Sequence, residues 1–419
     1  MMRDSGQNWL GSIPSTWGLS RIGSLYSLRN EKVSDKDYPP LSVTMKGVVP
    51  QLESAAKSDD GDNRKLVKIG DFAINSRSDR RGSCGISAYN GSVSLINTVL
   101  TPRGEMNPGY YNWLFHTVSF ADEFYKWGHG IVDDLWTTRW QEMKRIVVPV
   151  PSSDEQQAIA AYLDDQVAQI ESIIAEAQAS IEEYKQWREA IIYETVCKGI
   201  FAHASFRDTG DMWLKSLPLG IKLSRVGLHF ELILGKMLCP NQLDANYSLE
   251  PYYCAANVHF NGVDETELKQ MWFSPDEKTK YLVQRGDLLV VEGGAGAGGC
   301  SIAYPSQDTY IQNSIMIVRP RRDMDVRYVK YLLEMLVKRG YVDFVCNKAT
   351  IPHFTKEKLA NTPLPVFPEN EVKAMCDHID KQYKKIDSII AEKEALISDL
   401  GSYKQSLIYE VVTGKRKVV

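Results

Sequence analysis

The sequence predicts a mixed α/β (α+β) fold in which two globular domains are separated by two long helices. Three observations predict it. One peptide and its surroundings recur far apart in the chain, two long stretches carry a heptad pattern, and β-rich runs bounded by Gly, Asp or Pro precede each stretch. Strands and helices do not alternate regularly, so a doubly wound sheet is not expected. At 419 residues the chain is also too long for one ordinary core.

The internal repeat is carried by the peptide Ser-Ile-Ile-Ala-Glu, which occurs at Ser172–Glu176 and again at Ser388–Glu392, an offset of 216 (388 − 172). The same offset places Gly70-Asp71 on Gly286-Asp287. Near the two starts the offset is 204 (213 − 9), so the second copy carries about 12 extra residues (216 − 204). Two copies of one long unit predict a pseudo-two-fold arrangement that binds something with two similar halves.

The composition is that of a folded chain, with 43% hydrophobic and 24% charged residues. No apolar run is long enough to cross a bilayer, and the first residues lack the apolar core of a signal peptide, so we expect a cytoplasmic protein that binds no membrane. The seven cysteines include no Cys-x-x-Cys pair, which argues against a disulfide framework and a structural zinc site. The formal charge of −4 does not indicate nucleic-acid binding, although a mean charge can hide a local basic stripe.

Each copy leads through a proline-containing segment, 147–151 or 363–368, into a long helix. Pro disfavours helix in the residue before it, so these segments are predicted to be extended connectors. From Asp154 to Lys198 there is no Gly or Pro. We expect the two helices to pair as an antiparallel coiled coil; the alternative is that each packs on its own globular region. The heptad positions are Leu163, Val167, Ile170, Ile174, Ala177, Ile181, Tyr184 and Ile191, and then Ile379, Tyr383, Ile386, Ile390, Ile397, Leu400 and Leu407, interrupted by Lys393, Lys404 and Gly401.

The globular regions carry shorter signals. Strands are predicted at 66–74, 94–100, 281–292 and 310–318, and short amphipathic helices at 108–120 and 326–338. The resulting domains are a first target-binding domain at 1–151, a central long helix at 152–200, a second target-binding domain at 201–367 and a C-terminal long helix at 368–419.

Several motifs suggest chemistry that their context does not support. Gly294, Gly296 and Gly299 match the dinucleotide fingerprint, but that motif must open a helix, and the following 300–304 reads as a strand. A glycine-rich hairpin or a ligand-facing loop is expected instead. Asn107-Pro108-Gly109-Tyr110 resembles an adenine methyltransferase motif with Gly in place of the second Pro, and we interpret it as a helix start. With no Walker loop, no His-Glu-x-x-His and no Gly-x-Ser-x-Gly, we expect no catalytic residue, no metal and no cofactor in this chain.

The remaining candidates are basic, amide and acidic residues beside aromatic or glycine positions in predicted loops. Arg and Lys pair with guanine edges, Asn with adenine and Glu with the cytosine amino group. For any single residue a solvated or structural role is the alternative, and the densest cluster is Arg77, Arg80 and Arg81. The predicted DNA-binding residues are Lys46, Asn75, Arg77, Arg80, Arg81, Trp127 and His129 in the first copy, and Lys236, Asn257, Glu292, Lys348 and Thr350 in the second.

Over essentially its whole length the chain resembles the specificity subunits of type I restriction-modification systems. The resemblance depends on the order of short motifs that occur twice, because each motif alone is weak. These motifs are 9–14 with its echo at 213–218, Gly70-Asp71-Phe72 with Gly286-Asp287-Leu288, 350–354 leading into Pro363-Leu364-Pro365, Glu155-Gln156-Gln157 opening the first helix, and Ile192-Tyr193-Glu194 with Ile408-Tyr409-Glu410 at the helix ends.

The resemblance implies a non-catalytic, DNA-binding subunit of a methyltransferase and endonuclease complex used in phage defence. Each target-recognition domain would read one half of a split double-stranded DNA site, and the coiled coil would set the spacer. Two DNA adenine methyltransferase subunits, which bind S-adenosylmethionine, would dock on the coil, and restriction/translocase subunits would join for cleavage. Because the loops at 77–81 and 292–299 differ, the target is expected to be asymmetric. The alternative is a pseudo-dimeric coiled-coil scaffold or adaptor that binds proteins only.

Overall fold

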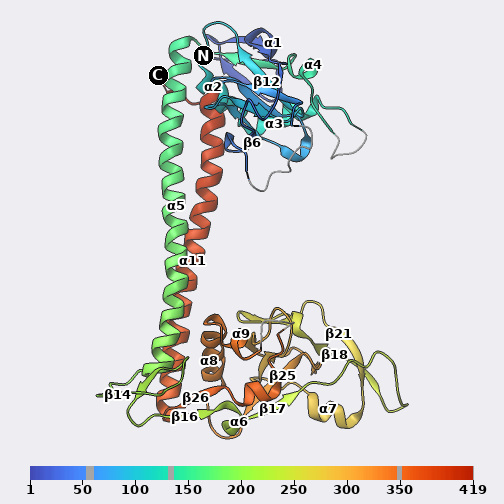
Figure 1. Cartoon of the computed structure of the whole chain (residues 1–419), viewed down its shortest axis with the longest axis vertical. Coiled ribbons are helices and arrows are strands. Elements are labelled where there is room, and N and C mark those ends of the chain that lie inside the picture. The colour runs from blue at the N-terminus through green and yellow to red at the C-terminus, as the bar shows by residue number, and fades with distance from the viewer. Residues whose placement is uncertain (53–60, 131–135, 347–351, 419) are drawn as a thin grey trace. The chain divides into compact units, whose positions relative to one another are not determined.

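The computed structural model describes residues 1–52, 61–130, 136–346 and 352–418, and it divides into two compact units. Unit 1 comprises Met1–Ala179 and Lys393–Val419, and unit 2 comprises Ser180–Glu392. The two long helices are α5 (Ser153–Lys198) and α11 (Glu369–Val412). Each unit therefore holds one globular domain together with one end of each long helix (Figure 1).

Unit 1 is built around a four-stranded antiparallel sheet in the order β10-β9-β12-β4 and a three-stranded sheet in the order β11-β8-β5. Three further strand pairs are β1-β2, β3-β13 and β6-β7. The strands are β1 (Met2–Asp4), β2 (Ser12–Pro14), β3 (Gly18–Arg21), β4 (Tyr26–Leu28), β5 (Lys32–Val33), β6 (Leu41–Thr44), β7 (Gly47–Pro50), β8 (Arg64–Val67), β9 (Phe72–Asn75), β10 (Cys84–Ile86), β11 (Gly91–Val93), β12 (Asn97–Pro102) and β13 (Val147–Val150), and the short helices are α1 (Ile22–Leu25), α2 (Pro108–Phe115), α3 (Val118–Lys126) and α4 (Trp140–Met143).

Unit 2 has a four-stranded antiparallel sheet in the order β17-β25-β22-β23 and a three-stranded sheet in the order β21-β18-β24. Its strand pairs are β14-β15, β16-β26 and β19-β20. The strands are β14 (Phe206–Asp208), β15 (Ser216–Pro218), β16 (Lys222–Arg225), β17 (Phe230–Leu234), β18 (Ser248–Tyr253), β19 (Val258–His259), β20 (Gly262–Val263), β21 (Lys269–Phe273), β22 (Leu288–Val291), β23 (Cys300–Ile302), β24 (Tyr310–Ile311), β25 (Ile315–Pro320) and β26 (Pro363–Val366), and the helices are α6 (Val226–His229), α7 (Pro275–Tyr281), α8 (Val326–Lys338), α9 (Tyr341–Val345) and α10 (Lys356–Ala360).

The two four-stranded sheets have the same strand order. Read from the edge, β10-β9-β12-β4 in unit 1 corresponds to β23-β22-β25-β17 in unit 2. In both sheets a Gly-Asp turn precedes the second strand of this order, which is β9 in unit 1 and β22 in unit 2. The aspartate of the turn is buried in both units, as Asp71 and as Asp287. The backbone N–H of Lys68 donates to Asp71 (2.8 Å), and that of Gln284 donates to Asp287 (2.7 Å). Each aspartate thus closes the turn that leads into the strand.

The helix predictions at 154–198 and 326–338 are confirmed, and the two connectors are extended as strands β13 and β26. The predicted helix 108–120 is instead two helices, because the Thr117 hydroxyl accepts from the Phe120 N–H and begins α3. The predicted strand 66–74 is also two strands, because Gly70 turns the chain at φ +86° between β8 and β9. Only 288–291 of the predicted strand 281–292 is a strand, and 310–318 contains β24 and most of β25 in different sheets.

Each unit has its own core. In unit 1, aromatic rings of α2 and α3 pack on β9, with ring centroids 4.8 Å apart for Phe72 and Phe115 and 4.5 Å apart for Phe115 and Phe120. In unit 2, α8 packs between its sheet and the first turns of α11, burying Leu332 and Leu333 in one cluster with Met375. The aromatic and aliphatic contacts hold each sheet to its helices.

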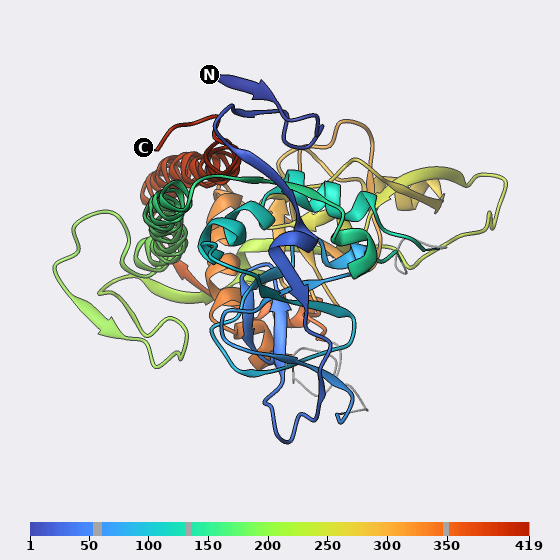
Figure 2. The same cartoon turned by 90° about the horizontal axis from the view of Figure 1, so that it is seen from above.

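The long helices bury their heptad stripes on both the other helix and the globular part of the same unit. In unit 1, Leu163 and Val167 of α5 share a cluster with Leu407 and Val411 of α11 and with the aromatic core. In unit 2, Ile192 of α5 shares a cluster with residues of both α11 and α8. Figure 2 shows the two helices nearly end-on, where they lie next to each other. Within the described residues, no helix is long and apolar enough to cross a membrane.

Candidate nucleic-acid interface

In unit 1, two segments meet at the end of β9: the loop 76–83 between β9 and β10, and the segment around Thr137. The N–H of Asn75 donates to Ser83 (2.9 Å) and closes the loop. Thr137 forms a β-bridge with Arg77, and it exchanges backbone hydrogen bonds of 3.0 and 3.1 Å with His129. The fold therefore brings together Asn75, Arg77 and His129, which lie up to 54 residues apart (129 − 75).

The three arginines of this loop differ in their partners. Arg80 is exposed and lies 3.6 Å from the carboxylate of Asp79. Arg81 forms an ion pair with Asp122 and lies over the Tyr125 ring, 5.6 Å from its centroid. Burial raises the pKa of Tyr125 above its ordinary value, so this ring stays neutral. Arg77 is exposed and has no ion-pair partner among the described residues, so its guanidinium is the cation most available to a ligand.

The other two predicted residues of unit 1 flank these segments. Trp127 is half-buried, and its indole N–H donates to Glu123 (2.8 Å). Lys46 is exposed at the tip of the β6-β7 hairpin, where its backbone N–H donates to the Thr44 hydroxyl (3.1 Å). This hairpin packs closely on β10, because a Cβ added at Gly85 would lie 2.6 Å from the hairpin backbone. Lys46 thus projects from a hairpin that packs on β10, whereas the indole N–H of Trp127 is already bonded to Glu123.

Unit 2 builds the same two-segment scaffold 216 residues further along. The N–H of Val291 donates to Gly299 (2.8 Å) and closes the loop 292–299, and Gly293 forms a β-bridge with His353. The N–H of Phe354 donates to the carbonyl of Glu292 (2.6 Å). The counterpart in unit 1 is the bond from Thr138 to Ser76 (3.0 Å). The described part of each unit therefore places one sheet loop against one later segment through matching backbone contacts. We call the sheet loops 76–83 and 292–299 the reader loops, and each loop together with its later segment a reader scaffold.

Comparison with solved structures identifies the fold that carries this geometry. A chain of a type I R-M system, solved in work on complex assembly and conformational transition, superposes with a TM-score of 0.72 and 14% identity, covering 96% of this chain and 99% of that chain. The HsdS subunit from Thermoanaerobacter tengcongensis superposes with a TM-score of 0.57 and 15% identity, covering 96% and 98%. The chain has the fold of a type I specificity subunit. No protein-family model and no curated protein matches the sequence.

Within this specificity-subunit fold the glycine-rich segment is a hairpin, as predicted, because β23 follows it where a dinucleotide site would need a helix. Gly294 and Gly298 have φ of +89° and +82°. A Cβ at Gly298 would lie 2.7 Å from Val342 and 2.8 Å from Val337, whereas a Cβ at Gly294 would meet nothing within 4 Å. Gly298 thus fixes the base of the hairpin against α8 and α9.

The two glycines make a matched pair of variants. Gly294→Ala is expected to cost about 1 to 2 kcal/mol, since only the left-handed backbone is penalised. Gly298→Ala is expected to cost about 1 to 3 kcal/mol more, since its methyl group also overpacks against the two valines. Chemical denaturation followed by circular dichroism measures both. Equal losses for the two variants would contradict the packing role assigned to Gly298.

Two predicted residues of unit 2 are buried, each with 7% of its surface exposed. The ammonium of Lys236 forms an ion pair with Glu277 and lies 5.0 Å from the Tyr247 ring centroid. Burial alone would raise the pKa of Glu277, but hydrogen bonds from Lys236 and Ser274 hold it below its ordinary value. The Asn257 amide accepts from the N–H of Cys254 (3.0 Å) and donates to a backbone carbonyl (3.1 Å).

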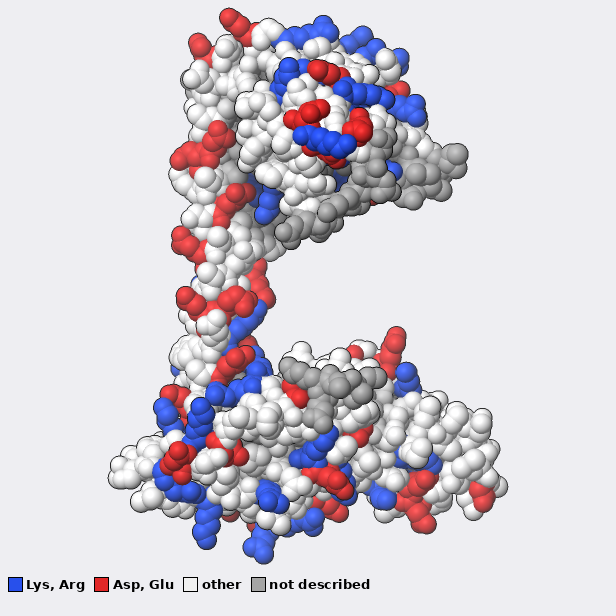
Figure 3. Space-filling model, in the orientation of Figure 1, with Lys and Arg blue, Asp and Glu red and all other residues white. Residues whose placement is uncertain are grey.

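The structure therefore places Lys236 and Asn257 in the interior of unit 2, where neither side chain faces solvent. The sequence did not indicate the burial of Lys236, because its partner Glu277 lies 41 residues further along the chain. The hydrogen-bond partners of Asn257 are closer, at Cys254 and Asp264. Glu292 lies in the reader loop of unit 2, as predicted. Lys348 and Thr350 lie outside the described residues. On the face displayed in Figure 3, basic and acidic side chains are interspersed on each unit.

Sequence reasoning missed Thr137 and His353, which form the second half of each reader scaffold. The repeat carried the missing signal, because the two positions differ by the same 216 residues (353 − 137). Within the described residues, no group of three or more His, Cys, Asp or Glu side chains is arranged to hold a metal ion. The arrangement is one of exposed or partly exposed loop side chains at the ends of sheet strands, which suits the recognition of a surface.

Proposed function

We propose that the chain is the DNA sequence-specificity subunit of a type I restriction-modification complex and that each unit reads one half of a bipartite target. The observation that carries the proposal is the reader scaffold, which occurs in both units of a specificity-subunit fold with matching backbone contacts and unlike side chains. Matching scaffolds suit two duplex segments of the same shape. Unlike side chains suit two different base sequences, so the target is asymmetric.

The long helices are proposed to pair as an antiparallel coiled coil that sets the spacer and docks two adenine methyltransferase subunits. Interhelical ion pairs support the pairing within each unit. Lys404 lies 3.2 Å from Glu171 in unit 1, and Arg188 lies 2.9 Å from Asp387 in unit 2. The methyltransferase subunits would supply S-adenosylmethionine, and restriction/translocase subunits would complete the complex. In this proposal the chain itself binds DNA and holds no catalytic group.

Sequencing of modified bases in a host that carries this chain with its methyltransferase tests the proposal. The expected result is methyladenine in one bipartite motif with a fixed gap, and loss of that motif when the chain is deleted. A purely protein-binding scaffold would leave the methylation pattern unchanged on deletion. In a gel-shift assay with the copurified complex, specific binding should also weaken steeply as salt rises, because phosphate contacts release counterions.

Arg77→Ala is expected to relax one base position in one half-site by about 1 to 3 kcal/mol, because an exposed guanidinium without an ion-pair partner among the described residues can bind guanine through two hydrogen bonds. The control is Arg145→Ala, which removes another exposed arginine outside both reader loops. Binding of the complex to a panel of single-base variants of the target measures the effect. A uniform loss on specific and unrelated DNA would show instead that Arg77 contacts phosphate.

A further inference from the structure

The matching backbone contacts allow the two reader loops to be compared position by position. The bond from Thr138 to Ser76 corresponds to the bond from Phe354 to Glu292, and the bridge of Arg77 with Thr137 corresponds to the bridge of Gly293 with His353. Ser76, Arg77 and Thr137 in unit 1 therefore occupy the places of Glu292, Gly293 and His353 in unit 2. Compared with unit 1, unit 2 has a glycine in place of the exposed arginine, a carboxylate in place of the serine hydroxyl and an imidazole in place of the threonine side chain.

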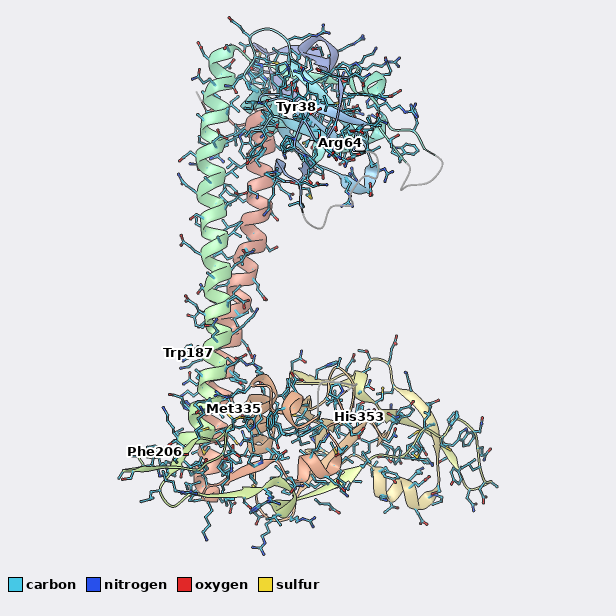
Figure 4. The ribbon with its side chains drawn as sticks, in the orientation of Figure 1. Tyr38, Arg64, Trp187, Phe206, Met335 and His353 are labelled. Atoms are coloured by element: carbon cyan, nitrogen blue, oxygen red, sulfur yellow. The ribbon has the colours of Figure 1, made fainter. Side chains whose placement is uncertain are left out.

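Glycine at 293 is what allows the imidazole to lie beside the carboxylate. A Cβ added at Gly293 would lie 2.9 Å from Nδ1 of His353, so the ring lies over the glycine backbone, in space that a side chain would need. Nδ1 of His353 is 3.7 Å from a carboxylate oxygen of Glu292. His353, labelled in Figure 4, is bridged to the start of the glycine hairpin of unit 2.

The Glu292 carboxylate retains free acceptor capacity. Ser76, at the same place in unit 1, is buried and turns its hydroxyl toward Thr98 (3.1 Å). The Glu292 side chain is instead 20% exposed, and within the described residues the only basic side chain within 4.0 Å of its carboxylate is that of His353, which is 60% exposed. A carboxylate accepts hydrogen bonds and donates none, and DNA phosphates repel it. Among groups on duplex DNA its partner is therefore a donor, which in the major groove is the exocyclic amino group of cytosine or adenine.

We propose that Glu292 is the specificity-determining residue of unit 2, where it accepts a hydrogen bond from the exocyclic amino group of a cytosine or adenine, and that His353 is its positioning residue. This inference rests on the proposed function. The two half-sites would then be read by opposite hydrogen-bonding roles. Arg77 of unit 1 would donate to acceptors on a base edge, and Glu292 of unit 2 would accept from a donor.

The test uses the complex of the full chain with its methyltransferase and a set of duplex targets. In one set dC is replaced by the deoxyriboside of 2-pyrimidinone, and in another dA is replaced by purine deoxyriboside, so that each analogue has a hydrogen in place of a single amino group. The wild-type complex is expected to lose binding by about tenfold to a hundredfold at one position of one half-site. The analogue that causes the loss identifies the base. Glu292→Ala should be insensitive to that analogue and should methylate targets with any base at that position.

The control is Glu231→Gln, which changes an exposed glutamate on edge strand β17 of the same sheet and should leave recognition intact. His353→Ala and Gly293→Ala should relax the same base position as Glu292→Ala, with no further effect in the double variant His353→Ala/Glu292→Ala. His353→Gln should restore part of the discrimination, which a merely structural role would not predict. If Glu292→Ala methylates the wild-type motif with unchanged base preference, the inference is wrong while the proposed function stands. If the wild-type chain directs no sequence-specific methylation, the proposed function itself fails.

Discussion

Replacing Arg319 with methionine is expected to lower the free energy of unfolding by about 3 to 5 kcal/mol, because it leaves a buried carboxylate without its counter-ion. Arg319 donates from Nε and Nη2 to the two oxygens of Asp287, each at 2.7 Å, and Nη2 also donates to the carbonyl of Leu282. The Asp287 side chain is only 5% exposed. Among the described residues the remaining partner of this carboxylate is the N–H of Gln284, which cannot neutralise the charge.

The double variant Asp287→Leu/Arg319→Met is the control, because it removes both charges. It should recover most of the lost stability, since replacing a buried ion pair with apolar side chains of similar volume is often neutral or stabilising. Hydrogen exchange of the β22 amides measures the effect in unit 2, with β9 of unit 1 as an internal reference. An unchanged exchange rate in Arg319→Met would show that the ion pair does not hold the sheet together.

The equivalent pair in unit 1 should be less sensitive to loss of its arginine. Arg29 donates to both oxygens of Asp71 at 2.6 and 3.0 Å, and this hydrogen bonding raises the pKa of Arg29 above its ordinary value. Asp71 also accepts from the Thr101 hydroxyl (3.0 Å), a bond that Asp287 lacks among the described residues. In Arg29→Met the Asp71 carboxylate therefore keeps one more hydrogen-bond donor than the Asp287 carboxylate keeps in Arg319→Met.

These ion pairs show why part of the fold could be predicted and part could not. The Gly-Asp turns recur at the repeat offset, so their equivalence was visible in the sequence. The arginines do not follow it. At that offset Arg319 corresponds to Arg103, which is exposed, while Asp71 takes its partner from the end of β4. A repeated sequence can thus preserve a buried charge and replace its counter-ion from another strand, which only the three-dimensional packing reveals.

The long helices were predictable because their signal is local and periodic over many turns, and Asp154 to Lys198 lacks any helix breaker. Short elements were less predictable. The segment 66–74 has continuous β propensity, yet Gly70 divides it between two sheets. The same limit applies to the interface. Arg77 and Lys236 are both cations beside turn residues, but only tertiary contacts distinguish the exposed guanidinium from the buried ammonium held by Glu277.

On the proposed function, exchanging residues 204–366 for the corresponding domain of a protein with the same fold is expected to change one half of the methylated motif completely and leave the other half unchanged. The boundaries follow from the junction between the end of α5 and the globular part of unit 2. The buried Glu371 carboxylate accepts from the N–H groups of Ile200 and Phe201, each at 3.2 Å, and lies 2.8 Å from Nε2 of His203. Cutting after His203 keeps this junction with the helices, so the new domain joins an intact support.

Sequencing of modified bases in cells that express the hybrid with its methyltransferase measures the outcome. A matched hybrid with boundaries at 199 and 372 replaces Glu371 and its partners together with the domain, and it should accumulate poorly when the donor domain lacks an equivalent carboxylate. In the first hybrid the reader loop of unit 1 is untouched, so the base that is proposed to pair with Arg77 should still be required. A change in both halves of the motif would mean that the two units do not read independently, and the proposed division of the target between them would be wrong.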